Sequence, residues 1–290
     1  MRGGEPVYGF SNPLLRESIY RSVLFSEKKE AHLQIASSLA IKQDFDNEDL
    51  QSIVFHYLQA GDRDGIVKWS ALAASRFYDA GAWDFCRYYY DLLANWTIDT
   101  EIALDARLKL AEIALMQADN PLARELLDKL PPLKGRQQEM AIYLNTVYLN
   151  NTAEYVKLQQ YLADKLNKLH DPQIKPLVNV FHLESLLFTN DTKHFFQSAL
   201  GIFPKLSSEP RVQNRLAGVI AQAYINCGEY DKALRYYENK LGLAEQLHDG
   251  LGIRIALNGM GVSCFRMGKK DEAGQYYQKA MQIAEQYGDR

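Results

Sequence analysis

The sequence predicts an all-α protein built from short antiparallel helical hairpins. Strand signals are nearly absent, because no Asn-Gly turn joins alternating apolar runs and clusters of Val, Ile and Thr are short. Helical periodicity runs through the chain, and small or polar breakers such as "QADNP", "LPPLKG" and "NCGE" interrupt it roughly every 12 to 20 residues. Two C-terminal segments also repeat each other. We therefore expect a right-handed α-α superhelix of about six stacked hairpins.

The bulk composition excludes several classes of partner. The 290 residues are 47% hydrophobic and 24% charged, with a net charge of -3. Nucleic acid or an anionic membrane would favour a strongly basic face, so neither is expected as a partner. No stretch approaches the roughly 18 to 20 uncharged apolar residues of a membrane span, and no secretory signal opens the chain. A cytoplasmic location is the expectation.

Residues that carry chemistry form no recognised set. Cys86, Cys227 and Cys264 stand singly in helical patterns, so we expect small buried hydrophobes in a reducing compartment. The six histidines lack metal-ligand spacing, although His182 and His194 lie on successive helices of one hairpin and could meet. Neither a phosphate-binding loop nor a nucleophile elbow occurs. We expect no catalytic, cofactor-binding or metal-ligating residue, and no enzyme.

The internal repeat lies at the C-terminal end. "IAQAYINCGEYDKALRYYENKLGLAEQ" from Ile220 and "MGVSCFRMGKKDEAGQYYQKAMQIAEQ" from Met260 superimpose at an offset of 40 residues, so that Gly228 matches Gly268. In the first helix, Ala221 or Gly261 lets the second helix approach closely, and the matched glycines fit the tight turn. In the second helix, a small residue is followed four positions later by a tyrosine that fills the space beyond it, and these pairs are Ala233 with Tyr237 and Ala273 with Tyr277.

Earlier segments keep part of this pattern. "LAASRFYDAGAWDFCRYYYDLL" and "KLAEIALMQADNPLARELLDKLP" place small residues in the corresponding positions. Residues of about 135–207 keep the helical hairpin periodicity but lose the small-residue signature, so two degenerate hairpins are expected there.

The repeated unit resembles the tetratricopeptide repeat (TPR), whose helices carry small, aromatic and glycine residues at fixed offsets. The two C-terminal units fit this pattern well. The tryptophan usual in the first helix is missing, Cys264 stands where an aromatic residue is usual, and the spacing of 40 residues exceeds the basic repeat length by about six.

The N-terminal part resembles the region that follows the ATPase core in STAND-type signalling ATPases, which include maltose-regulator-like activators and ATPases joined to adenylyl cyclases or kinases. Three short motifs carry the resemblance: "FSNPLLRESIY", a "LH-x-x-IA"-type helix and "HYLQAGD". Asn12 stands where the family usually has His. The matching residues are Phe10, Leu14, Leu15, Arg16, Glu17, Ile19 and Tyr20, then His32, Leu33, Ile35 and Ala36, then His56, Tyr57, Leu58, Ala60, Gly61 and Asp62.

The resemblance implies a domain organisation. Residues 1–45 would be a helical remnant of an upstream winged-helix region with its connecting helix, and residues 46–290 a TPR-like repeat domain. Both ends look cut, which suggests a fragment of a larger protein with an upstream ATPase domain. The apolar stripe of residues 8–24 should fold back on the helix expected over residues 26–41 and on the first hairpin, or contact another copy in a homo-oligomer.

A non-catalytic interaction and regulatory module is therefore the expected function, with a partner peptide or protein in the concave groove lined by the first helices. The expected groove is polar and mildly basic, which favours an acidic partner. A small-ligand sensor that binds an inducer inside the superhelix is the alternative, and a deep pocket with convergent polar groups would favour it. The expected groove residues are Arg215, Gln222, Asn226, Arg254, Asn258, Val262 and Arg266.

Overall fold

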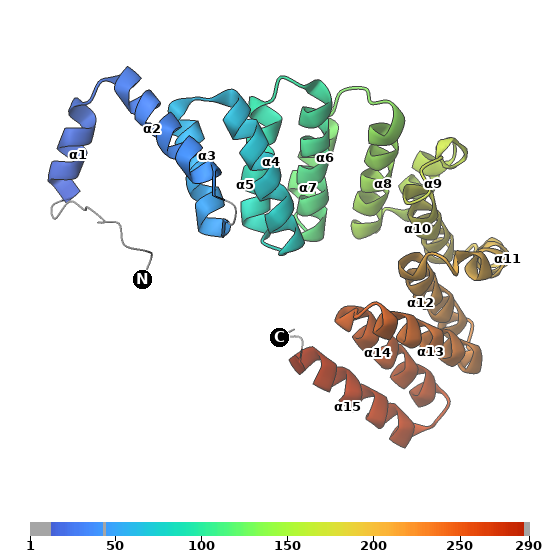
Figure 1. Ribbon diagram of the computed structural model, residues 1–290. Helices are drawn as coiled ribbons and strands as arrows, with labels where there is room; N and C mark the ends of the chain where they lie inside the picture. The colour runs from blue at the N-terminus through green and yellow to red at the C-terminus, as the bar shows by residue number, and fades with distance from the viewer. Residues whose placement is uncertain (1–12, 43–44, 287–290) are drawn as a thin grey trace. The chain divides into compact units, whose positions relative to one another are not determined.

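The computed structural model describes residues 13–42 and 45–286, and all regular elements in these ranges are helical (Figure 1). The chain divides into two compact units, residues 1–131 and 132–290. The all-α class is confirmed. The proposed boundary between residues 45 and 46 stays a prediction.

The first unit holds seven helices among the described residues, and those from α2 to α7 each pack mainly against their neighbours in sequence. Its core gathers Trp69, Phe77, Cys86 and Tyr89 with aliphatic residues of the adjoining helices. The helices are α1 (Pro13–Ser22), α2 (Phe25–Ala40), α3 (Asn47–Ala60), α4 (Arg63–Asp79), α5 (Trp83–Trp96), α6 (Thr100–Met116) and α7 (Asn120–Asp128).

The second unit holds eight α-helices and two 3-10 turns among the described residues. Helices α12 to α15 are long and regular, whereas α9 and α11 are short and run into the 3-10 turns. The elements are α8 (Gly135–Asn151), α9 (Tyr155–Leu162), η1 (Leu166–Lys168), α10 (Ile174–Phe188), α11 (Thr192–Ile202), η2 (Phe203–Leu206), α12 (Pro210–Asn226), α13 (Tyr230–Gln246), α14 (Gly250–Arg266) and α15 (Lys270–Gln286).

These helices form the six hairpins that the sequence predicts: α4/α5 and α6/α7 in the first unit, and α8/α9, α10/α11, α12/α13 and α14/α15 in the second. Within each unit, Figure 1 shows consecutive hairpins stacked side by side. Within each unit, neighbouring hairpins cover each other's apolar flanks, and the buried residues gather in separate clusters between them.

One turn geometry recurs at eight helix ends among the described residues. A residue with positive φ follows the helix, and the next N–H reaches back to the carbonyl five residues earlier, as in a Schellman motif. Glycine occupies this position in four of the turns, while Ala118, Ala153, Asn190 and His248 occupy it in the others. Gly228 and Gly268 adopt φ of 76° and 81°, as their predicted role in the turn requires.

The next helix after such a turn often begins with a capping aspartate. The carboxylates of Asp62, Asp119 and Asp249 each accept a hydrogen bond from the backbone N–H of the third residue of the helix that follows, α4, α7 or α14. These bonds satisfy donors that the helix itself leaves unpaired. Turn and cap together explain why short breakers suffice to reverse the chain.

Two glycines of α14 allow neighbouring helices to approach closely. A Cβ atom on Gly259 would lie 2.3 Å from the ring of Tyr237, and one on Gly261 would lie 2.6 Å from the ring of Tyr277. The predicted approach of the second helix at Gly261 is confirmed. Gly259 adds a contact that the sequence did not predict, because Tyr237 also packs against the following repeat.

The N-terminal helix makes the predicted contact with the next helix in part. The Tyr20 hydroxyl lies 3.0 Å from Nε2 of His32 on α2, but Leu14 and Leu15 on α1 are exposed. Residues 1–12, which include Phe10 and Asn12 of the first N-terminal motif, lie outside the described residues.

Candidate functional site

The expected groove residues lie on α12 and α14, which are neighbouring first helices of consecutive repeats and contact each other. Gln222 and Asn226 are exposed, one turn apart on α12, and the Gln222 amide donates to Oδ1 of Asn226 over 3.0 Å. The Tyr237 hydroxyl donates to Oε1 of Gln222 from below over 3.4 Å. This part of the predicted set is thus solvent-facing and held in place from the core.

Arg215, at the other end of α12, is engaged within the protein. Its guanidinium donates to the Glu184 carboxylate over 2.7 Å and lies 4.0 Å from the centre of the Phe181 ring. Both partners are on α10, so this arginine joins two successive hairpins. The sequence did not predict this ion pair because Glu184 belongs to a degenerate repeat.

On α14, Asn258 and Arg266 are exposed, while Val262 is half-buried. Arg254 is half-buried and has an interaction within the chain. The exposed stripe of α14 also carries Leu251 and Ile255, which sequence reasoning missed. Leu251 and Ile255 are four residues apart, and Asn258, Val262 and Arg266 follow at steps of three, four and four, so this helical spacing was the available signal. We call the surface formed by Gln222, Asn226, Leu251, Ile255, Asn258 and Arg266 the α12–α14 face.

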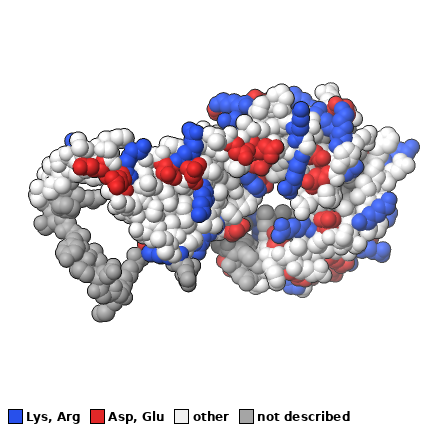
Figure 2. All heavy atoms as spheres, turned by 45° about the horizontal axis from the view of Figure 1, so that its top comes forward, with Lys and Arg blue, Asp and Glu red and all other residues white. Residues whose placement is uncertain are grey.

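Helices α12 and α14 contain arginines but no Asp or Glu. Arg211 and Arg266 are exposed, and Arg215 and Arg254 are half-buried. Because neither helix carries an Asp or Glu of its own, the two helices form a locally cationic region. Figure 2 shows acidic and basic side chains interspersed over the view that it displays.

A buried polar pair supports α12 from the side of α13. Lys240 is only 7% exposed, and its ammonium donates to Oδ1 of Asn214 over 2.7 Å and to the Asn214 carbonyl over 3.4 Å. The Asn214 amide in turn donates to the Lys240 carbonyl. Burial lowers the pKa of Lys240, against a smaller opposing effect of Asp249. The pair fixes the register of α12 against α13.

The histidines that meet are His32 and His56 in the first unit. Their Nδ1 atoms are 2.7 Å apart, so one ring must donate and the other accept. Burial lowers the pKa of both, and the charge of His32 further lowers that of His56. His194 instead contacts Asp191 of its own helix cap. The predicted meeting with His182 is not among the contacts of the described residues.

The cysteine prediction is partly wrong. Cys86 and Cys264 are buried as expected, but Cys227 is exposed. It is the C-cap of α12 and directly precedes Gly228, which has a positive φ in the turn to α13. Within the described residues, no group of three His, Cys, Asp or Glu side chains is placed to hold a metal ion. None of the described helices is long and apolar enough to cross a membrane.

Comparison with known families bears on the C-terminal helices first. Residues 213–286, which run from α12 to the end of α15, match the family model described as tetratricopeptide repeat. The match covers these four helices, about a quarter of the chain. The TPR assignment covers the two repeats in which the turn glycines, the buried alanines and the paired tyrosines occur together.

Solved structures extend the fold likeness along the chain. A Rap protein complexed with competence and sporulation factor is 16% identical, with a TM-score of 0.57, over 84% of this chain and 67% of that one. A STAND protein with a tetratricopeptide repeat sensor from Pyrococcus horikoshii is 18% identical, with a TM-score of 0.54. That match covers 93% of this chain but 42% of the STAND protein. A search of curated proteins gave no match.

Proposed function

We propose that this chain is a protein-interaction and regulatory module whose α12–α14 face binds an acidic segment of a partner protein. The observation that carries the proposal is the absence of any Asp or Glu from α12 and α14, whose shared face presents Arg266 and the exposed amides of Gln222, Asn226 and Asn258 beside Leu251 and Ile255. A segment with carboxylates and aliphatic side chains would match this surface. First helices of repeat proteins commonly present such surfaces to peptides.

The second part of the proposal is that the module is the TPR arm of a larger STAND-type signalling ATPase. Three N-terminal motifs support it, as does the fold likeness to a STAND protein of which this chain would span less than half. In such an arm, partner binding would release or hold the ATPase. An antibody raised against residues 46–290 tests this in extracts: a band far larger than this chain that also binds ATP agrees with it, and a band of the chain's own size contradicts it.

The binding proposal is tested with an array of extended peptides of graded Asp and Glu content. We expect the purified chain to retain acidic peptides, with affinity falling as salt rises. Arg266→Glu should abolish retention, because it reverses the exposed charge of the stripe. Lys193→Glu is the matched control, since this exposed lysine lies on α11. Retention independent of acidic content, or unchanged in Arg266→Glu, would refute the proposal.

A small-ligand sensor is the second candidate. The observation that favours it is the sensor role named for the tetratricopeptide repeats of the STAND neighbour. A thermal-shift screen against sugars and nucleotides separates the candidates: a compound that stabilises the chain equally well in Arg266→Glu and the unmodified protein would favour a sensor site away from the α12–α14 face.

A further inference from the structure

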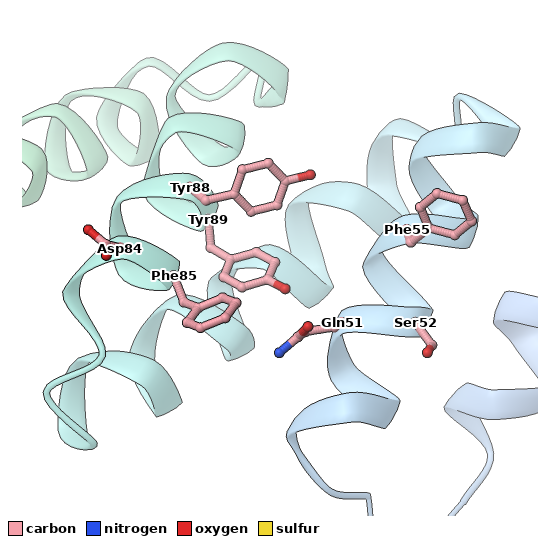
Figure 3. Close-up of a pocket in the computed structure, with 7 residues that line it drawn as sticks. All are labelled: Gln51, Ser52, Phe55, Asp84, Phe85, Tyr88 and Tyr89. Atoms are coloured by element: carbon pink, nitrogen blue, oxygen red, sulfur yellow. The ribbon is translucent and has the colours of Figure 1, made fainter.

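The first unit contains an aromatic recess between α3 and α5 that lies outside the proposed partner site. It has a volume of about 510 Å³. Figure 3 shows the rings of α5 projecting to the side on which α3 lies. We call it the α3–α5 recess; its lining residues are Gln51, Ser52 and Phe55 from α3 and Asp84, Phe85, Tyr88 and Tyr89 from α5.

The rings are exposed but firmly supported. Phe55 is 51% exposed, Phe85 46% and Tyr88 50%. On α5, the buried Phe77 of α4 stacks on Phe85 with ring centres 4.9 Å apart and on Tyr89 with centres 5.6 Å apart. On α3, Phe55 meets the ring of His32 from α2 edge-on, with ring centres 6.1 Å apart. The Tyr88 ring meets that of Tyr89 edge-on at 5.1 Å. Such a preformed apolar wall loses little side-chain entropy when a ligand packs against it.

The polar groups around the rings are available for a ligand. Among the residues that the structure describes, no hydrogen bond or ion pair uses the side chains of Gln51, Ser52 and Asp84, or the hydroxyls of Tyr88 and Tyr89. Burial raises the pKa of Tyr89 to about 12, with a smaller effect of Tyr88, so this hydroxyl is a donor at neutral pH. The recess therefore offers donors for carbonyl groups as well as acceptors.

The charge of the recess is negative. Helix α3 carries Glu48 and Asp49 and no Lys or Arg, while α5 carries Asp84, Asp91 and a single cation, Arg87. Arg87 is half-buried and does not line the recess. Asp49 is paired with Lys42 over 2.7 Å, which leaves Asp84 as the carboxylate at the recess itself. Anionic ligands, including nucleic acid, are disfavoured there.

We propose that the α3–α5 recess binds a short extended peptide that combines proline residues with a flanking arginine or lysine. Aromatic walls pack against proline rings, and the carbonyls of a polyproline II segment, which make no internal hydrogen bonds, accept from tyrosine and glutamine side chains. Residues 84–89 span about 8 Å along α5, which matches about three residues of such a segment. Asp84 at the rim supplies the partner for the basic residue.

This inference does not depend on the proposed function. The α12–α14 face should select acidic segments, whereas the recess should select basic ones. Substitutions in α3 or α5 therefore leave the array results for the α12–α14 face unchanged, and Arg266→Glu leaves recess binding unchanged. Each proposal can therefore fail in its own experiment while the other still holds.

Fluorescence anisotropy with a fluorescein-labelled peptide of roughly ten residues, containing two prolines three positions apart between arginines, tests the recess. Phe55→Ala on α3 and Tyr88→Ala on α5 should each weaken binding at least about tenfold. Phe265→Ala, of an equally exposed ring on α14, is the control and should have no effect. Asp84→Asn should remove the preference for arginine over glutamine flanks. Circular dichroism verifies that every variant is folded.

Several outcomes would overturn the inference. One is absence of binding at peptide concentrations of about 1 mM. Another is equal affinity for a peptide in which alanine replaces both prolines. A third is binding that Phe55→Ala and Tyr88→Ala leave intact. If sedimentation shows a dimer that both substitutions dissociate, the recess is a contact between two copies of the chain instead.

Discussion

Hairpins α10/α11 and α12/α13 lie next to each other in the second unit, and they place large and small buried side chains in opposite order along their second helices. Five residues after the turn, α11 has the large Phe195 where α13 has Ala233, and four residues later α11 has Ala199 where α13 has Tyr237. All four residues are buried. The large aromatic side chain that fills the hairpin thus lies about one helical turn earlier in α11 than in α13, while the same two positions are buried in both helices.

The first helices of the two hairpins, α10 and α12, differ in a corresponding way. Leu183 of α10 stands seven residues before the turn, at the position of Ala221 in α12, and both are buried. Helix α11 has 11 residues and α13 has 17. The turns agree nonetheless, because Asn190 and Gly228 both adopt positive φ with the same backbone hydrogen bonds. A hairpin in this chain is defined by its turn and its buried positions, and its small-residue signature is only one way to fill them.

The largest expected effect comes from the displaced volume itself. Phe195→Ala should cost about 3 to 5 kcal/mol of unfolding free energy, because it empties a fully buried position. Adding Ala199→Tyr, which recreates the arrangement of α13, should recover part of this loss. Urea unfolding followed by circular dichroism measures both, with the exposed neighbour Leu200→Ala as a control. A double variant no more stable than Phe195→Ala would show that the two arrangements are not interchangeable.

The next effect concerns the buried pair that only one of the two hairpins has. The positions of Asn214 and Lys240 correspond to Pro176 and Ile202 in α10/α11. Asn214→Leu should cost about 3 kcal/mol, because it leaves the Lys240 ammonium buried without its closest acceptor. Lys240→Met should cost less, about 1 to 2 kcal/mol. The double variant should lose less than the sum, and strict additivity in denaturant unfolding would contradict the coupling.

Smaller effects are expected at the turns. Gly228→Ala should destabilise α12/α13 by about 1 kcal/mol, since alanine at φ of 76° is strained. Asn190→Gly should change α10/α11 by only a few tenths, because Asn tolerates this region. Ala153→Gly, in α8/α9, should stabilise by about 0.5 to 1 kcal/mol. Calorimetric melting temperatures rank the three variants, and a loss of stability in Ala153→Gly would refute the argument.

The smallest effect is a difference in pH dependence. His182 of α10 stands where α12 has the fully buried Ile220. Burial lowers the pKa of His182 below its usual value near 6.5. The unfolded chain therefore takes up the proton more readily, and stability falls as the pH drops below about 6.5 through the folded pKa. The free energy of unfolding, measured in urea between pH 7.5 and 5, should therefore depend slightly less on pH in His182→Leu than in the unmodified protein. The control His170→Gln, at an exposed position, should leave this pH dependence unchanged.

Much of the fold was predictable from sequence because its rules are local. Helical periodicity and breakers predicted six hairpins, including the two degenerate ones, and Gly228, Gly268 and Gly261 predicted turns and a close approach that the structure confirms. The exchange of Phe195 with Ala199 was not predictable, since the expected signature places the small residue first. It required knowing which positions face inward.

Less of the candidate site was predictable. Asn258 and Arg266 are exposed on α14, as a partner-binding surface requires, but their role in binding stays a prediction. Leu251 and Ile255 were not predicted, because the groove was expected to be polar. The ion pair of Arg215 depends on a carboxylate about thirty residues away, Glu184, and no local pattern encodes that distance. Contacts between repeats are set by stacking, which sequence periodicity leaves open.

The exposed Cys227 has a practical consequence. It is next to Asn226 at the edge of the α12–α14 face, while the two other thiols of the chain are buried. A maleimide dye should therefore label the native protein at one place without any engineered cysteine. The emission of this dye would report the binding of a peptide to α12 in real time. The buried Cys86 and Cys264 would react only when their own hairpins open, so the rate at which they are labelled would measure local unfolding in each unit.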